Sequence, residues 1–215
     1  MIVADLDLAR ASQTTQELQK KWPETCYTFL QLDVSEPDSV SEKIADIAER
    51  YSRIDILVNN AGIAPAKVPL AQLTKAQWKK TLDVNLMGSV NCTIAAVLAM
   101  QAKKQGVIVS LSSMSGFTGG QAVAAPYACS KAAIECLTKA MAREYAALGI
   151  RVLAVAPGLI QTDMTTSFSY DSSTVPLQRM GTPEDVADVI VSISSDHFRY
   201  VTGTTIDING GLLMR

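Results

Sequence analysis

The sequence predicts an α/β fold built on a doubly wound parallel sheet, with helices on both faces. Short apolar runs rich in β-branched residues alternate along the chain with longer stretches of helical periodicity. This alternation is typical of parallel strands joined by crossover helices. The chain has 215 residues, of which 48% are hydrophobic, and this is enough for one sizeable core. No repeat or low-complexity linker divides residues 1–215, so we expect a single domain.

Each predicted element follows from its own pattern and from the residues that bound it. Thr182 and Pro183 open the last helix as a hydroxyl cap and an early proline, and Gly149 ends the longest one. The predicted strands are Ile2–Asp5, Cys26–Asp33, Ile54–Asn59, Gly106–Ser112, Arg151–Ala156 and Thr204–Ile208. The predicted helices are Leu8–Lys21, Asp38–Tyr51, Thr74–Lys104, Ala125–Leu148 and Pro183–Ser194.

Composition argues against several classes of partner. The net charge is −2 with interspersed signs, so we expect no nucleic-acid partner. The most apolar stretch, Thr93–Met100, is too short to cross a bilayer, and we expect no membrane partner. The four cysteines show no metal-ligand spacing, so we expect no metal site. A reducing cytoplasm is the compartment that fits them best.

A tyrosine and a lysine four residues apart, Tyr127 and Lys131, lie in the helix predicted at Ala125–Leu148. Residues at this spacing share one helix face, so the ammonium can stabilise the phenolate and lower the pKa of the phenol. Such a phenol can exchange a proton with an alcohol or carbonyl oxygen, which is the acid–base half of a hydride transfer. Alone the pair is a weak signal, because most such pairs lie on the surface.

Three further segments accompany this pair. They are Val107–Ser113, an apolar strand that ends in hydroxyls, Asn59-Asn60-Ala61-Gly62, and Asp83-Val84-Asn85. In this order they resemble the short-chain dehydrogenase/reductase family over essentially the whole chain. The ending Val201–Gly211 is similar to that of 3-oxoacyl-carrier-protein reductases and polyol dehydrogenases. The resemblance implies a Rossmann-like fold and an oxidoreductase that moves a hydride between NAD(H) and a secondary alcohol or ketone.

The resemblance also implies a catalytic set of four residues. Tyr127 is the general acid/base, and Lys131 tunes it and bonds the nicotinamide ribose. Ser113 binds the reacting oxygen, with Ser112 as the competitor if the register is one residue off. Asn85 distorts its helix and holds a water of the proton relay.

A dinucleotide site is implied along the carboxyl ends of the strands. Asp5 would accept hydrogen bonds from the adenosine ribose and repel a 2′-phosphate, so we expect NAD, with NADP less favoured. Asp33 and Val34 match the adenine contacts of the family. The other implied cofactor contacts are Asn60, Ala61 and Gly62 on the adenosine and ribose side, and Pro157, Gly158 and Thr162 at the nicotinamide.

One part of the family pattern is absent from the 215 residues. The family opens with a strand and a T-G-x-x-x-G-x-G turn whose amides cradle the pyrophosphate. The missing strand would lie between Ile2–Asp5 and Ile54–Asn59. Either the sequence belongs to a longer enzyme, or it is a truncated, non-catalytic dimerising module that no longer binds a dinucleotide. A gap of about two strand spacings, ~9–10 Å, between Ile2–Asp5 and Ile54–Asn59 would favour the longer enzyme. Direct pairing of these two strands would indicate a rearranged sheet.

Two apolar surfaces predict self-association. Small residues occupy more than one face of Ala125–Leu148, and the chain ends in Leu212-Leu213-Met214. We therefore expect a homotetramer, with a homodimer as the alternative. The polar segment Leu159–Arg179 is expected to be the loop that binds a small-molecule alcohol or ketone, whose identity the sequence leaves open.

Overall fold

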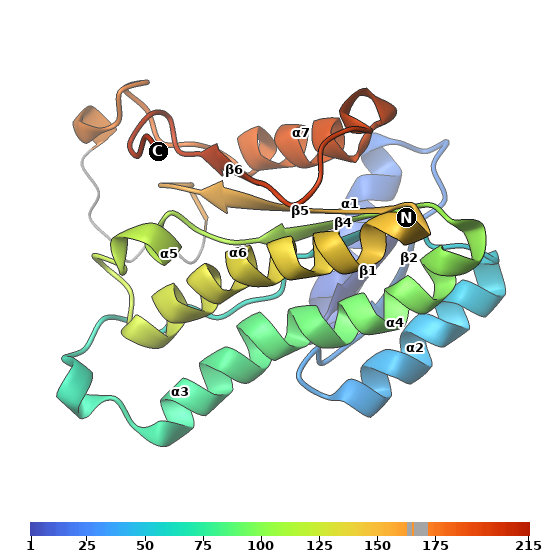
Figure 1. Ribbon diagram of the computed structural model, residues 1–215, viewed down its shortest axis with the longest axis horizontal. Helices are drawn as coiled ribbons and strands as arrows, with labels where there is room; N and C mark the ends of the chain where they lie inside the picture. Colours follow the sequence, from blue (N-terminus) through green and yellow to red (C-terminus); the bar gives the residue numbers. More distant parts are fainter. Residues whose placement is uncertain (163–164, 166–171) are drawn as a thin grey trace.

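The computed structural model describes residues 1–162, 165 and 172–215, and its elements follow the predicted alternation of strands and helices (Figure 1). The strands are β1 (Ile2–Asp5), β2 (Thr28–Gln31), β3 (Ile56–Asn59), β4 (Gly106–Leu111), β5 (Ile150–Pro157) and β6 (Thr205–Ile208). The α-helices are α1 (Leu8–Lys21), α2 (Pro37–Tyr51), α3 (Lys75–Leu82), α4 (Gly88–Lys103), α5 (Ser115–Thr118), α6 (Ala125–Tyr145) and α7 (Pro183–Ser194). The centre of the expected substrate loop lies outside the described residues.

The main sheet contains four parallel strands in the order β3-β4-β5-β6. Side chains alternate between its faces. On one face, Ile108 and Val152 pack with Met100 of α4 and Met141 of α6. On the other, neighbouring strand residues pack against α7, which covers that face (Figure 1). Both faces of β4 and β5 are therefore buried, as expected for a parallel sheet.

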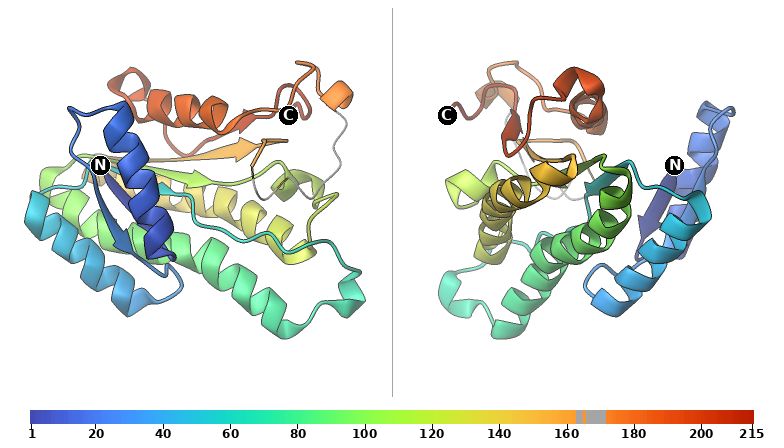
Figure 2. Two further views of the ribbon diagram at one scale, coloured as in Figure 1. Left: turned by 180° about the vertical axis from the view of Figure 1, so that it is seen from behind. Right: turned by 45° about the vertical axis from the view of Figure 1, so that its right-hand side comes forward.

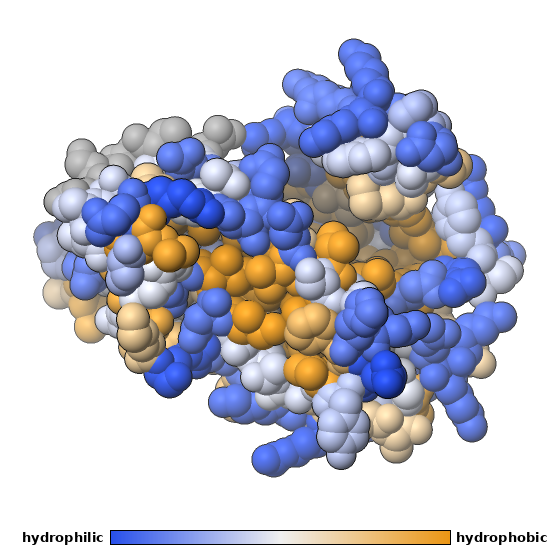
Figure 3. Space-filling model, turned by 90° about the horizontal axis from the view of Figure 1, so that it is seen from above, coloured by the Kyte–Doolittle hydropathy of each residue, from blue (hydrophilic) through white to orange (hydrophobic). Residues whose placement is uncertain are grey.

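β1 and β2 form a second, two-stranded parallel sheet, which Figure 2 shows apart from the other strands. Among the described residues no pairing joins β1 to β3, so the alternative in which these strands become direct neighbours is wrong. The sheet is instead divided at the position of the missing strand. Ile56 and Val58 of β3 are 49% and 41% exposed. The face seen from above carries an apolar area in a hollow (Figure 3).

The two-stranded sheet is attached to the rest of the molecule through α2 and α4. Val40 and Ile44 of α2 form a buried cluster with Leu32 and with Cys92 of α4. The Asn91 side-chain amide donates a 2.9 Å hydrogen bond to the carbonyl of Val34. Gly88 allows this approach, because a Cβ there would stand 2.5 Å from a methyl carbon of Val34.

The helical stretch Lys75–Lys103 contains α3, a π-helical turn over Asp83–Met87, and α4. By length and composition it could cross a membrane, although the strongly apolar part considered in the sequence, Thr93–Met100, is only a portion of it. Its apolar window is 44% buried within the fold, and α4 packs between α2 and the main sheet (Figure 1). A core helix of a globular protein passes the same test, so length and composition alone are weak evidence for a membrane span.

Two predicted boundaries have the expected chemistry. Thr182 and Asp185 form a reciprocal capping box at the start of α7. Gly149, with a φ of 74°, ends the helical segment that follows α6. A Cβ at Gly149 would stand 2.1 Å from the carbonyl oxygen of Lys104, so this turn requires glycine. Both devices fix the lengths of the elements that flank β5.

Candidate active site

Tyr127 and Lys131 lie one turn apart near the start of α6, as predicted. Pro126 occupies the first turn of this helix, where its missing N–H removes no helical hydrogen bond. The Lys131 ammonium lies 5.6 Å from the centroid of the Tyr127 ring. The two side chains therefore share one helix face and are close enough for the charge to act on the phenol.

Lys131 is a buried amine, only 4% exposed. Its Nζ donates a 2.6 Å hydrogen bond to the carbonyl of Leu111, the last residue of β4. Burial disfavours the charged form and lowers the pKa of Lys131 to about 8. The amine is thus poised to gain or lose a proton near neutral pH, which is unusual for lysine.

Asn85 lies in the π-helical turn Asp83–Met87 and is 1% exposed. Its Oδ1 accepts from the backbone N–H of Ile63 at 2.8 Å, and its Nδ2 donates to the Ile63 carbonyl at 3.0 Å. Nδ2 also donates to the hydroxyl of Ser130 at 3.0 Å. The expected distortion of the helix is therefore present, and π-turns of this kind are frequent at functional sites.

The two adjacent serines after β4 have different surroundings. The Ser112 hydroxyl, 3% exposed, lies 2.9 Å from the Lys131 carbonyl and 2.8 Å from a carboxylate oxygen of Glu135. The Ser113 Oγ instead accepts from the backbone N–H of Ser115 at 3.1 Å. Ser112 is therefore committed to helix α6, whereas Ser113 belongs to the turn that leads into α5.

The segment after β3 approaches Lys131 of α6 at Gly62. A Cβ on Gly62 would stand 3.4 Å from Asn85 Oδ1 and 3.6 Å from Lys131 Nζ, so the glycine keeps space open beside both groups. Asn59 ties the strands together, because its amide donates to Ser110 of β4 and to Thr93 of α4. Asn60 and Ala61 are exposed beyond this anchor.

The residues expected at the nicotinamide end follow β5. Pro157 and Gly158 are partly buried, and a Cβ on Gly158 would stand 2.7 Å from the Cβ of Asn209. Thr162 is exposed and its backbone N–H donates to Thr165 Oγ1 at 2.9 Å. The strands β3, β4 and β5 thus bring Gly62, Ser113 and Gly158 to the same carboxyl edge of the main sheet.

The expected adenosine contacts lie on the separate two-stranded sheet. Asp5 is exposed, and its carboxylate accepts from the backbone N–H of Asp7 at 2.8 Å. Asp33 accepts hydrogen bonds from the hydroxyl and the N–H of Ser35, which lower the pKa of Asp33. Val34 is held by Asn91 as described. These residues are therefore positioned by a unit that pairs with no strand of the main sheet in the described chain.

Sequence reasoning missed two residues, Ser130 and Glu135, that contact residues considered for the site. Ser130 accepts from Asn85 and donates to the Tyr127 carbonyl at 2.7 Å, and its position three after the tyrosine was the available signal. Glu135, 5% exposed, contacts Ser112 and Arg215. A charged residue one turn beyond Lys131 in a helix of small residues was its only sequence signal.

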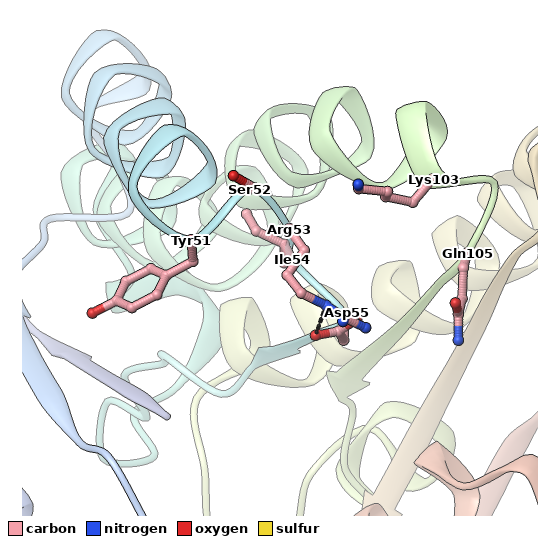
Figure 4. Close-up of a pocket in the computed structure, with 7 residues that line it drawn as sticks. All are labelled: Tyr51, Ser52, Arg53, Ile54, Asp55, Lys103 and Gln105. Carbon is pink, nitrogen blue, oxygen red and sulfur yellow. Dashed lines mark hydrogen bonds and ion pairs between the residues drawn. The ribbon is translucent and has the colours of Figure 1, made fainter.

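Two cavities lie near the main sheet. One, of about 270 Å³, is lined by Tyr51–Asp55, Lys103 and Gln105, where Arg53 and Asp55 form an ion pair (Figure 4). It opens at the amino ends of β3 and β4, away from the predicted chemistry. The other, of about 410 Å³, is lined by Lys67–Leu70, the glycines 119 and 120, Val123 and Ala125. This second cavity adjoins the start of α6, two residues from Tyr127.

Comparison with known proteins gives one family. Residues 1–213 match the family model described as Enoyl-(Acyl carrier protein) reductase. The 3-oxoacyl-[acyl-carrier-protein] reductase of Staphylococcus epidermidis is 36% identical over 210 residues, covering 95% of this chain and 84% of the relative.

Solved structures agree in fold. A 3-oxoacyl-[acyl-carrier protein] reductase with bound NAD from Brucella melitensis has a TM-score of 0.90 at 34% identity, covering 100% of this chain and 81% of that chain. The structure described as ElxO with NADP bound has a TM-score of 0.87 at 31% identity, covering 98% and 87%. The relatives thus include chains solved with either dinucleotide. The chain belongs to the short-chain dehydrogenase/reductase family of oxidoreductases.

Proposed function

We propose that this chain transfers a hydride between a nicotinamide dinucleotide and a ketone or secondary alcohol, and that 3-oxoacyl thioesters are the first substrates to test. The observation that carries this proposal is the placement of Tyr127 and the buried amine of Lys131 on one face of α6, beside the strand end that bears Ser113. The substrate class follows from the names of the most similar relatives.

In this proposal each residue has one task. Tyr127 passes a proton to the substrate oxygen as the carbonyl is reduced, and takes it back in the reverse direction. Ser113 donates a hydrogen bond to the same oxygen, which stabilises the developing alkoxide. The Ser112 hydroxyl is already hydrogen-bonded to Glu135 and to the Lys131 carbonyl. This supports Ser113, rather than Ser112, as the serine that binds the substrate oxygen.

Lys131 and Asn85 support the tyrosine. The Lys131 ammonium favours the phenolate electrostatically, and its remaining N–H groups are suited to ribose hydroxyls. Asn85 holds the loop at Ile63 and, through Ser130, the backbone at Tyr127. Its place in the proton relay is part of this proposal.

The described residues fit parts of a dinucleotide. The Lys131 amine suits the ribose on the nicotinamide side, the open space at Gly62 suits the adenosine and ribose side, and the exposed carboxylate of Asp5 suits the adenosine ribose. The bound dinucleotide would supply or accept the hydride. The 215 residues contain no Gly-rich turn to receive the pyrophosphate. We propose NAD over NADP, because a carboxylate at Asp5 repels a 2′-phosphate.

The second candidate is a module of this family that binds no dinucleotide. The observation in its favour is the divided sheet, since β1 and β3 flank the place where the family has its phosphate-binding strand. This candidate retains the packing of α4 and α6 and assigns Tyr127 no chemistry.

One experiment separates the two candidates. Fluorescence titration of the chain with NADH and NADPH measures binding, and dinucleotide absorbance at 340 nm measures turnover with 3-oxoacyl thioesters and simple ketones. The 215 residues alone should bind NADH poorly or not at all, because they contain no Gly-rich turn for the pyrophosphate. The same residues preceded by the family's opening strand and Gly-rich turn should bind NADH saturably and turn over the thioester. Turnover of the longer chain that is lost in Tyr127→Phe supports the enzyme, whereas an intact fold of that longer chain with neither binding nor turnover supports the non-catalytic module.

A further inference from the structure

A buried carboxylate lies one helical turn beyond Lys131 on α6. Glu135 is 5% exposed, and its two oxygens have different partners. Oε1 accepts from the Ser112 hydroxyl at 2.8 Å, and Oε2 accepts from the Arg215 guanidinium at 3.2 Å. A buried carboxylate needs such partners, because an unpaired charge in the interior is strongly destabilising.

Arg215 connects this carboxylate to two other elements, β6 and α5. It forms a two-pronged ion pair with Asp207 of β6, at 2.8 and 2.9 Å. Its guanidinium carbon lies 3.3 Å from the centroid of the Phe117 ring in α5. The side chain is 30% exposed, and the hydrogen bond to Asp207 is the main reason that the pKa of Arg215 is raised. Arg215 therefore stays charged and is held in one orientation.

The other end of the network reaches the strand end that carries Ser113. The single hydroxyl proton of Ser112 has two acceptors, the Glu135 carboxylate and the Lys131 carbonyl. Lys131 in turn donates to Leu111. Gly116 lets α5 pack directly against α6, because a Cβ at this position would stand 2.8 Å from the backbone nitrogen of Ala132. Residues 111–116 are thus fastened to α6 on both sides of Ser113.

We propose that Glu135, held in place by Arg215, is a positioning residue that sets the strand end bearing Ser113 against the helix bearing Tyr127 and Lys131. It acts through Ser112 and touches no substrate. The chemical role of Ser113 and Tyr127 rests on the proposed function above, whereas the positioning itself is a property of the chain alone.

The network also sets the charge near Lys131. Glu135 is at the i+4 position from Lys131, where side chains on a helix are neighbours. With Arg215 present, the Glu135 carboxylate shares one cation with Asp207. Without it, an uncompensated negative charge lies one turn from the amine and favours the ammonium form of Lys131.

The test compares Arg215→Gln, Arg215→Lys and Glu135→Gln with Arg53→Gln, a matched control that breaks a surface pair with Asp55. The readout is the NMR titration of the Lys131 side-chain ¹³Cε signal, assigned by its loss in Lys131→Met. We expect Arg215→Gln to raise the Lys131 titration midpoint by about one pH unit, since a less compensated negative charge one helical turn away favours the ammonium form. Arg215→Lys should shift it less, and Glu135→Gln together with Arg215→Gln should abolish the rise.

A second readout follows the strand end. Hydrogen exchange of peptides covering residues 111–116 should accelerate by about tenfold or more in Glu135→Gln, equivalent to a loss of ~1.4 kcal/mol of local protection, and should not change in Arg53→Gln. A lower melting temperature with an unchanged Lys131 midpoint would mean a structural ion pair only and would overturn the proposal. If Glu135→Gln does not fold, Arg215→Lys decides. Neither readout needs a cofactor or turnover, so a failure of the proposed function would be seen separately.

Discussion

The side-chain amide of Asn85 donates a 3.0 Å hydrogen bond to the Ser130 hydroxyl, which donates in turn to the backbone carbonyl of Tyr127 at 2.7 Å. A π-helical turn in one helix is thereby connected to the first turn of another. Because Asn85 also holds Ile63 by two hydrogen bonds, three segments meet at one buried amide.

Replacing Asn85 should therefore destabilise the chain. Asn85→Leu keeps the volume and removes three hydrogen bonds, leaving the buried groups of Ile63 unpaired, so we expect a loss of roughly 2–4 kcal/mol in urea unfolding. Asn91→Leu is the matched control, because its amide donates to the carbonyl of Val34 in a less buried position. It should cost about 1 kcal/mol. Equal losses of unfolding free energy in the two variants would contradict the prediction that the buried contacts of Asn85 stabilise the chain more than the single hydrogen bond of Asn91.

Tyr127→Phe tests the proton donor. The variant keeps the ring beside Lys131 and removes only the hydroxyl, so kcat should fall by at least ~10², the usual effect of losing a positioned acid/base. Dinucleotide binding should survive. Tyr145→Phe, near the other end of α6, is the control and should turn over normally. Steady-state kinetics in which both variants retain wild-type kcat would remove Tyr127 from the mechanism.

The buried amine predicts a specific pH dependence of stability. Burial lowers the pKa of Lys131 from its ordinary value to about 8, so between about pH 8 and 10 the unfolded chain binds more protons than the folded one. The free energy of unfolding should rise with pH across that window, by about 3 kcal/mol at most. Below pH 8 both states carry the proton, and the destabilisation is fully present.

Lys131→Met provides the comparison for this prediction. It removes the titrating group and keeps an unbranched apolar side chain, so urea unfolding should show no rise between about pH 8 and 10. The variant should also be more stable than the parent chain at pH 7. A parent chain whose stability stays flat or falls over the same window would contradict the buried-amine interpretation.

Cofactor choice can be tested at the exposed end of β1. Asp5→Ala combined with Leu6→Arg removes a carboxylate and supplies a partner for a 2′-phosphate, so preference should move towards NADP. Leu6 is 62% exposed, and an arginine fits there without repacking. Leu6→Arg alone is the control and should shift the ratio of NAD to NADP affinity less. A parent chain that already prefers NADPH in a binding titration would refute the role of Asp5.

Self-association should depend on α4 as well as on the two surfaces predicted from the sequence, Ala125–Leu148 and the ending Leu212-Leu213-Met214. Ile94 and Leu98 lie one turn apart on its outer face and are 54% and 62% exposed, an arrangement that favours burial against a second copy. Leu98→Glu should lower the mass measured by sedimentation velocity at micromolar concentration. Thr14→Glu places the same charge on an exposed polar position of α1 and should leave the mass unchanged. A parent chain that sediments as a monomer would contradict the prediction of a homotetramer or homodimer.

Local patterns predicted most of the elements because their signals are local. The bounds of α1 and α7 agree with the sequence, and at α7 the capping box explains why. β2 is shorter than Cys26–Asp33, because pairing with the four residues of β1 fixes its length. That partner is set by tertiary structure, which a window of sequence does not contain.

In the candidate site, too, local features were predictable and tertiary contacts were not. Tyr127 and Lys131 were predictable because a helix fixes their spacing, and Gly62 and Asn85 followed from the family pattern. Glu135 and Arg215 were not, because they are 80 positions apart and meet only through the folding of β6 beside β5. The choice between Ser112 and Ser113 likewise depends on which hydroxyl faces α6.

The divided sheet has a consequence for the solubility of the chain. β1 and β3 each have an edge that pairs with no strand of the described chain, and β3 exposes Ile56 and Val58 beside it. Such edges are templates for intermolecular strand pairing, which leads to aggregation. Light scattering should therefore rise steeply with protein concentration, and charged substitutions at Ile56 and Val58 should keep the chain dispersed.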